Sequence, residues 1–183
     1  MTASQLSFKP VTASTWPDFE ALFESRGAPK YCWCMAWRKM EGDRATAPAK
    51  VRKAAMHKRV TQRVPIGILA YQDGEPVGWC SVAPRDTLLR MSPDQDDEEK
   101  GVWSVVCFFV KREMRGKRLS ERLLDAAVKL AFKRGAKTVE GYPVAKGSPS
   151  YRFMGYLPLF KDKGFEETGR AGSRRHVVRK TKR

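Results

Sequence analysis

An almost unbroken apolar run spans Val102 to Val110. It reads Val-Trp-Ser-Val-Val-Cys-Phe-Phe-Val and is rich in β-branched and aromatic residues, which is typical of a strand buried on both faces. A basic turn, residues 111–118, follows at once, and apolar residues then recur at helical spacing between Leu119 and Arg134. Basic residues in the last turn, with Gly135 after them, favour the end of a helix there. The pattern therefore predicts a strand, a basic turn and a helix in direct succession.

Upstream of this unit, the pattern predicts one strand and two helices. Leu6 to Val11 alternates as a strand does. Apolar residues at spacings of three and four then predict a short helix that Ser14 or Thr15 caps. A second helix is expected over Thr46 to Arg63, with Thr46 as its cap. Its inward positions are expected to be Val51, Ala55, Met56 and Val60.

The remaining elements are a hairpin, one helix and three short strands. Apolar segments at 66–71 and 76–82 flank Asp73-Gly74, a pair that tolerates the positive φ of a tight turn. After the central helix, the pattern predicts a strand at 138–142, a short helix within 151–162, and strands at 165–169 and 174–179.

The element order is β-α-α-β-β-β-α-β-α-β-β, which predicts a mixed α/β (α+β) sheet. The chain has 183 residues, a length at which a single core buries roughly 70% of the extended surface. No internal repeat divides it. We therefore expect one domain over residues 1–183, with a basic C-terminal end.

The formal charge of +16 indicates attraction to anionic ligands or polyanions. Residues 170–183 carry seven Lys or Arg and no acid, and the outer face of the helix at 46–63 is basic throughout. Such a face is either solvated or rests on a phosphate backbone. The acidic block at 94–99 is either a solvated loop or a collar that attracts a cationic substrate.

The four cysteines are Cys32, Cys34, Cys80 and Cys107, and we expect reduced thiols. Zinc sites usually need a second close ligand pair beside a Cys-x-Cys unit, and the two histidines are isolated, so no metal site is expected. Cys107 is interpreted as a core residue rather than an acyl-enzyme nucleophile. No stretch approaches the ~18 apolar residues of a membrane helix and no apolar signal region begins the sequence, so a cytoplasmic location without membrane association is expected.

The segment from Tyr31 to Arg38 is unusually aromatic for a connection. It is either an extended piece packed on the core, since aromatic side chains mostly supply buried area, or the wall of a substrate pocket. In the second interpretation Tyr31, Trp33 and Trp37 line the pocket and Arg38 meets an anion.

The turn before the central helix has the chemistry of an anion site. The first backbone N–H groups of a helix lack intrahelical acceptors and carry partial positive charge, so they hold a phosphate. Arg115, Lys117 and Arg118 add full charges. The alternative is an ordinary solvated turn between a strand and a helix.

Four pieces of the sequence together resemble the GNAT superfamily of acetyl-CoA-dependent N-acyltransferases, and a bacterial branch of it. They are a strand containing Gly78 after an Asp-Gly turn, the strand at 108–110, the Arg115-Gly-Lys turn, and the Leu-Phe-x-x-x-Gly-Phe ending at 159–165. The resemblance implies a mostly antiparallel sheet with flanking helices and a splayed cofactor cleft. It covers nearly all of the chain from the hairpin to Val178.

For the cosubstrate, the resemblance implies that the main chain of Phe108, Phe109 and Val110 pairs with the pantetheine arm of acetyl-CoA. Backbone amides in the turn would cradle the pyrophosphate, and the residues implied there are Arg115, Gly116, Lys117, Arg118, Leu119 and Ser120. Arg118 and Ser120 occupy positions where the family usually has small residues. Arg118 would either clamp the phosphates or weaken cofactor binding.

For catalysis, the resemblance implies direct acetyl transfer to a neutral amine, with a general base and an acid for the departing thiolate. The family's usual tyrosine acid corresponds to Phe160 here, so Tyr156 is the candidate acid. Glu140 is the candidate base, because burial in an apolar sheet would raise its pKa. The alternative is that Glu140 pairs with a nearby Lys or Arg.

The sequence thus predicts an N-acetyltransferase that acts on a primary amine of a small molecule or protein. The alternative is a basic nucleic-acid- or ribosome-associated module built on the same fold, with or without acetyl-CoA binding. The acceptor stays open, as does the choice between monomer and homodimer.

Overall fold

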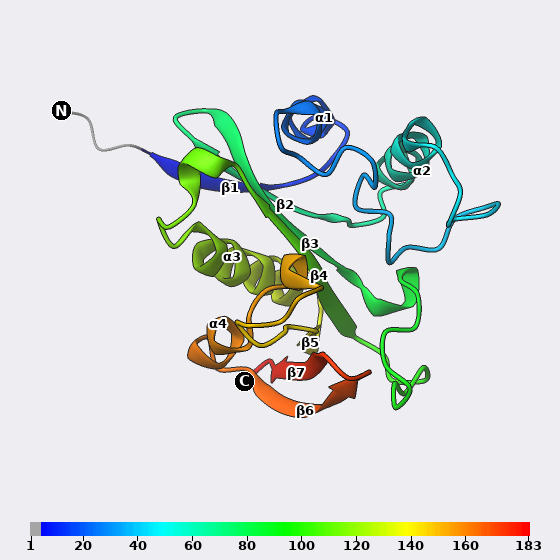
Figure 1. The fold of residues 1–183 in the computed structure, drawn as a ribbon, viewed down its shortest axis with the longest axis vertical. Helices are drawn as coiled ribbons and strands as arrows, with labels where there is room; N and C mark the ends of the chain where they lie inside the picture. Colours follow the sequence, from blue (N-terminus) through cyan, green and yellow to red (C-terminus); the bar gives the residue numbers. More distant parts are fainter. Residues whose placement is uncertain (1–4) are drawn as a thin grey trace.

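The computed structural model describes residues 5–183. Its centre is a seven-stranded sheet in the order β1-β2-β3-β4-β5-β7-β6 (Figure 1). The strands are β1 Leu6–Pro10, β2 Gly67–Gln72, β3 Glu75–Pro84, β4 Val102–Val110, β5 Thr138–Gly141, β6 Glu166–Ala171 and β7 Arg175–Thr181. The helices are α1 Trp16–Glu24, α2 Ala49–Thr61, α3 Leu119–Lys133 and α4 Leu157–Asp162.

The predicted element order is confirmed, as is the mixed, mostly antiparallel sheet. Only β4 and β5 pair in parallel; the other five neighbouring pairs in this part of the chain are antiparallel. The predicted hairpin joins β2 to β3, with Asp73 at φ 51° and Gly74 at φ 88°. These positive values are what a tight two-residue turn requires.

The helix starts differ from the prediction in two places. Thr15 precedes α1, but its hydroxyl donates to the Pro10 carbonyl instead of capping the helix. Thr46 is not the cap of α2, because it binds Asp43 in the preceding loop and the helix begins after Pro48. Val51, expected to face inward, is 46% exposed in the first turn of the shortened helix, whose buried residues are Met56 and Val60 further along.

The helices lie on both faces of the sheet, with α1 and α2 on one side and α3 and α4 on the other (Figure 1). The helix α3 packs closely on β3 at Gly78. A Cβ there would lie 3.1 Å from Leu123 and 3.2 Å from Leu119. Absence of a side chain at Gly78 thus lets α3 approach the sheet.

The strands β4 and β5 pair only over Val102–Val105 and Thr138–Gly141. Beyond these four pairs β4 continues to Val110 without a ladder partner on this side, so the expected splay is present. On its other side, Ser81 pairs with Cys107 and Val82 with Val105, which makes Val106 an extra residue of a β-bulge. The bulge coincides with the point where β4 and β5 separate.

Candidate functional site

A groove of about 420 Å³ lies where the end of β4, the start of α3 and α4 meet. Of the residues expected to bind the cosubstrate, six line it: Val110, Arg115, Gly116, Arg118, Leu119 and Ser120. The candidate acid Tyr156 lines the same groove. The structure therefore brings the expected anion site and Tyr156 together.

The turn at the start of α3 leaves backbone amides without intrahelical partners. Gly116 has φ 76° and Arg118 has φ 57°, both in the left-handed region. The first helical hydrogen bond runs from the Arg122 amide to the Arg118 carbonyl, at 3.3 Å. The preceding helical amides thus have no carbonyl of the helix to donate to, an arrangement that suits an anion.

Arg118 adopts the conformation that glycine favours, and its side chain binds Glu121. The Nε and Nη2 groups donate to the two carboxylate oxygens at 2.9 and 2.7 Å. The hydrogen bonds from Arg118 lower the pKa of Glu121, so both groups are charged at neutral pH. The guanidinium of Arg118 is therefore engaged at the rim of the groove, with 79% of the side chain exposed.

Two other cations border the groove. Arg115 donates through Nε to the Val110 carbonyl at 3.2 Å, which fixes the turn to the last residue of β4. Lys146 also lines the groove, from the loop after β5. No spacing in the sequence pointed to Lys146, because that loop has no periodic pattern to place it.

The two aromatic residues before Val110 point to opposite faces of the sheet. Phe108 packs toward α3 and α4, and Phe109 packs in the core under α1 and α2. Neither lines the groove, and neither does Lys117. What the two phenylalanines present to the open edge of β4 is their main chain.

Phe160 is fully buried at the fork between β4 and β5. Its ring is 6.2 Å from that of Phe108, and a Cβ added to Gly141 would lie 2.4 Å from the Phe160 ring. The Phe160 side chain therefore fills the space beside Gly141 and the Phe108 ring. It has no group that could transfer a proton.

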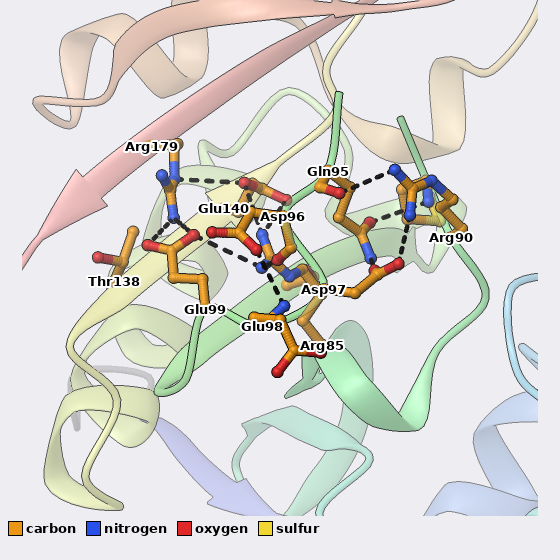
Figure 2. A network of polar contacts seen from close by, with 12 residues as sticks. Arg85, Arg90, Gln95, Asp96, Asp97, Glu98, Glu99, Thr138, Glu140 and Arg179 are labelled. Atoms are coloured by element: carbon orange, nitrogen blue, oxygen red, sulfur yellow. Dashed lines mark hydrogen bonds and ion pairs between the residues drawn. The ribbon is translucent and has the colours of Figure 1, made fainter. Parts of the chain in front are cut away.

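Glu140 lies in a buried ionic network at the opposite end of β4 (Figure 2). It is paired in the sheet with Ser104, six residues before Val110 and thus roughly 20 Å from it along the strand. Its carboxylate is 3.3 Å from Arg85 Nη1 and 3.2 Å from Arg179 Nε. The structure thus shows the pairing with cations that was one of two alternatives for Glu140, and it does not bring Glu140 and Tyr156 together.

A tyrosine completes this network. The Tyr142 hydroxyl donates to Glu140 at 2.5 Å and lies 3.2 Å from the Ser104 hydroxyl. Burial and the Glu140 carboxylate raise the pKa of Tyr142, so its hydroxyl stays protonated as a donor. The surroundings of Glu140 are polar, not the apolar sheet interior that the sequence suggested.

The acidic block folds onto the same network instead of forming a free collar. Glu99 accepts two hydrogen bonds of 2.6 Å from Arg179 and lies 3.5 Å from Arg85 (Figure 2). Asp97 binds Arg90. These acids neutralise arginines of the same chain.

The aromatic segment 31–38 packs mainly on the core. Trp33 is 4% exposed and stacks on Phe23. Arg38 is 1% exposed and its partners are internal groups, so the second interpretation, in which it meets a substrate anion, is wrong for this residue. Tyr31 is exposed, and Trp37 is partly buried against a separate core cluster.

Trp37 forms one side of a stack with Arg175 and Tyr151. The Arg175 guanidinium lies 4.8 Å from the Trp37 ring and 5.1 Å from the Tyr151 ring. Both rings pack against a core cluster that contains Val106, the bulged residue of β4. The stack thus adjoins the fork from the face opposite α3.

The basic face of α2 is largely engaged within the chain. Lys53 forms ion pairs with Glu20 and Glu24, and Lys58 forms one with Glu41. Arg52 and Arg59 donate to backbone carbonyls of the preceding loop. This face is therefore not an open row of cations for a phosphate backbone.

Residues 5–183 contain neither a membrane-spanning helix nor a cluster of metal-ligating side chains. No helix in this part of the chain is both long and apolar enough to cross a membrane. No group of three or more His, Cys, Asp or Glu side chains in it could hold a metal ion.

The sequence and the fold of this chain are similar to those of known proteins. The sequence model described as the acetyltransferase (GNAT) family matches residues 31–155. No curated protein matches the chain in sequence.

Solved structures share the fold at low sequence identity. An N-acetyltransferase (PaiA) from Thermoplasma acidophilum, in complex with coenzyme A, has a TM-score of 0.59 and 13% identity, covering 97% of this chain and 99% of that one. The ribosomal-protein-alanine N-acetyltransferase from Brucella melitensis has a TM-score of 0.56 and 16% identity, covering 96% and 99%. An acetyltransferase of the GNAT family from Streptococcus pneumoniae has a TM-score of 0.58 and 12% identity, covering 97% and 100%.

The family match spans more than half of the chain and includes the strand, turn and helix that form the groove. The chain belongs to the acetyltransferase (GNAT) family.

Proposed function

We propose that the chain is an N-acetyltransferase that moves an acetyl group from acetyl-CoA to a primary amine of a small molecule or protein. The observation that carries this proposal is the groove at the start of α3, where unpartnered helix amides adjoin the unpaired edge of β4. Phosphates suit the amides, and an extended amide-containing arm suits a free strand edge. Acetyl-CoA combines both features.

Each part of the groove has a role in this proposal. The amides of Gly116 to Ser120 hold the pyrophosphate, and Arg115 and Lys146, which line the groove, supply positive charge around it. The main chain of Phe108 to Val110 pairs with the pantetheine arm. The arm runs along β4 toward the bulge at Val106, so the thioester lies near the fork.

The chemistry needs a neutral amine at the thioester carbonyl. The amine nitrogen forms the new C–N bond and releases one proton to solvent, the C–S bond breaks, and the departing thiolate takes a proton. Tyr156 is the proposed donor of that proton, since it lines the groove and carries the one acidic hydroxyl placed there. The acceptor approaches from the face of Trp37.

The cytoplasm is the proposed place of action. The cysteines of the described chain are all free, which matches a compartment that keeps thiols reduced.

Calorimetry with acetyl-CoA tests the proposal directly. We expect saturable binding that Arg115→Ala weakens and that Arg112→Ala, an exposed arginine of the same turn outside the groove, leaves unchanged. Release of free CoA thiol in the presence of a panel of primary amines then separates an enzyme from a passive binder. Absence of binding at millimolar acetyl-CoA would sink the proposal.

A further inference from the structure

Arg38 is an arginine inside the core. Its side chain donates to the Ile66 carbonyl at 2.8 Å, to Ser81 Oγ at 2.9 Å and to the Cys34 carbonyl at 2.5 Å. Within residues 5–183 no carboxylate forms an ion pair with it. A guanidinium withdrawn from water without an anion is costly, so a negative charge is expected nearby.

The ionisable group closest to this guanidinium is a thiol. Arg38 Nη1 donates to Cys34 Sγ at 3.3 Å. Cys107 pairs in the sheet with Ser81, which Arg38 also contacts, and it belongs to the same core cluster as Cys34. Interaction with Cys107, followed by the charge of Arg38, lowers the pKa of Cys34. The same interaction and burial raise the pKa of Cys107. Of the two sulfurs, Cys34 is the one that the Arg38 guanidinium contacts, so the negative charge is assigned to Cys34.

The backbone is strained at this point. Trp33 has φ 48° and Cys34 has φ 56°, two consecutive non-glycine residues in the left-handed region. Such residues are uncommon and persist where the surroundings enforce them. Here the conformation holds Trp33 in the core and sets the Cys34 sulfur against Arg38 and Cys107.

We propose that Cys34 is a buried thiolate paired with Arg38, and that Cys34 and Cys107 form a dithiol site that reacts with hydroperoxides. The two residues belong to one core cluster, under α1 and α2. Cys80 instead faces the α3 side of the sheet, and burial raises its pKa. Cys32 is half-buried with a raised pKa, so it too is a thiol.

The reaction has two steps. The Cys34 thiolate attacks one oxygen of the hydroperoxide, an S–O bond forms, the O–O bond breaks, and the released alkoxide takes a proton from water. The Cys107 sulfur then attacks the resulting sulfenic acid, the S–S bond forms, and the S–O oxygen leaves as water with the Cys107 proton. Two thiols lose two electrons in total, and the hydroperoxide is reduced to an alcohol and water.

A disulfide between Cys34 and Cys107 would connect two separate parts of the fold. Cys107 follows the bulged Val106 on β4, and Cys34 lies in the loop between α1 and α2. A disulfide ties that loop to β4 at the fork. It also removes the negative charge that Arg38 faces, so the oxidised form is less stable than the reduced one.

Hydrogen peroxide is the probe for the experiment, because it is small enough to reach side chains that are 5% and 8% exposed. Wild-type protein is treated with it and analysed by intact mass and peptide mapping. We expect a loss of about 2 Da, from the two hydrogens removed, in one cross-linked peptide pair that joins Cys34 to Cys107. Absence of reaction, or a bond that involves Cys32 or Cys80 instead, overturns the proposal.

Thiolate absorbance near 240 nm gives a second readout that needs no oxidant and no acetyl-CoA. We expect the wild type and Cys80→Ser to show this absorbance at neutral pH, and Cys34→Ser to lack it. Cys80→Ser is the matched control, since it removes another buried cysteine. If Cys34→Ser fails to fold, the wild-type absorbance and peptide map still decide: a wild type without thiolate absorbance at neutral pH contradicts the ion pair.

Discussion

Arg118 and Glu121 form a two-point ion pair across the first turn of α3, at the rim of the anion groove. Glu121 is an acid where phosphates are proposed to bind, and Arg118 cancels its charge. The pair explains how a large side chain fits a position that usually takes a small one. It also makes the effect of Arg118 on binding conditional on Glu121.

A double-mutant cycle tests this coupling. Arg118→Ala exposes the Glu121 carboxylate to the pyrophosphate and is expected to weaken acetyl-CoA binding several-fold. Glu121→Gln alone should not weaken it, and adding Glu121→Gln to Arg118→Ala should restore it. Calorimetric Kd values for the four proteins give the coupling, and independent effects of the two substitutions would contradict it.

Tyr156→Phe tests the proposed acid. The substitution removes the hydroxyl and keeps the ring, so kcat should fall by about 10²–10⁴ with little change in acetyl-CoA affinity. Tyr151→Phe is the control, because Tyr151 contributes its ring to the stack on Arg175. Equal kcat values for Tyr156→Phe and the wild type would remove Tyr156 from the mechanism.

Glu140→Gln separates the two interpretations of that residue. Because Glu140 pairs with two arginines, this substitution leaves their buried positive charge uncompensated. It should lower the unfolding free energy by about 3–5 kcal/mol. Glu98→Gln, an exposed position of the acidic block, should cost nearly nothing. Chemical denaturation measures both. A stable Glu140→Gln protein with an activity lowered a hundredfold or more would identify Glu140 as a base instead.

Gly141→Ala tests whether Phe160 fills the fork. The added methyl would lie 2.4 Å from the Phe160 ring, and overpacking of this kind costs about 1–3 kcal/mol. Gly147→Ala is the matched control, because no atom lies within 4 Å of its Cβ position. A thermal melt of each variant should show a clear fall in Tm for the first only.

The Cys34 thiolate predicts a pH dependence of stability. Its pKa is lowered from 9.0 to about 5, so the unfolded state binds more protons between these values and folding gains stability as pH rises through that window. The gain is complete above pH 9 and is lost as pH falls toward 5. The difference in unfolding free energy between the wild type and Cys34→Ser should therefore widen with pH from 5 to 9. A constant difference would contradict the ionised thiol.

Elements with strong periodicity could be predicted from sequence, because their conformation depends on residues that are close together in the chain. The run ending at Val110, the hairpin at Asp73-Gly74 and the apolar stripe of α3 each determine their own conformation. The start of α2 could not be predicted. Thr46 is a residue type that caps helices, but its hydroxyl donates a hydrogen bond to Asp43 instead.

The side-chain surroundings of the site were less accessible to sequence reasoning, because they depend on distant partners. Glu140 forms an ion pair with Arg85, which is 55 positions away in the sequence, and no local sequence pattern indicates this pairing. Arginine is rarely buried, so the core position of Arg38 ran against expectation. The groove was predictable because its main ingredient is the backbone of one strand, turn and helix.

The network around Glu140 has a consequence for synthesis of the chain on the ribosome. Glu99 and Arg179 are 80 positions apart, so Glu99 and Glu140 are both made well before the guanidinium that joins them. Until Arg179 emerges, the carboxyl groups of the nascent chain lack one of their two arginines and β5 lacks its neighbour β7. We therefore expect the sheet to close late, with the fork of β4 and β5 as one of the last regions to become ordered.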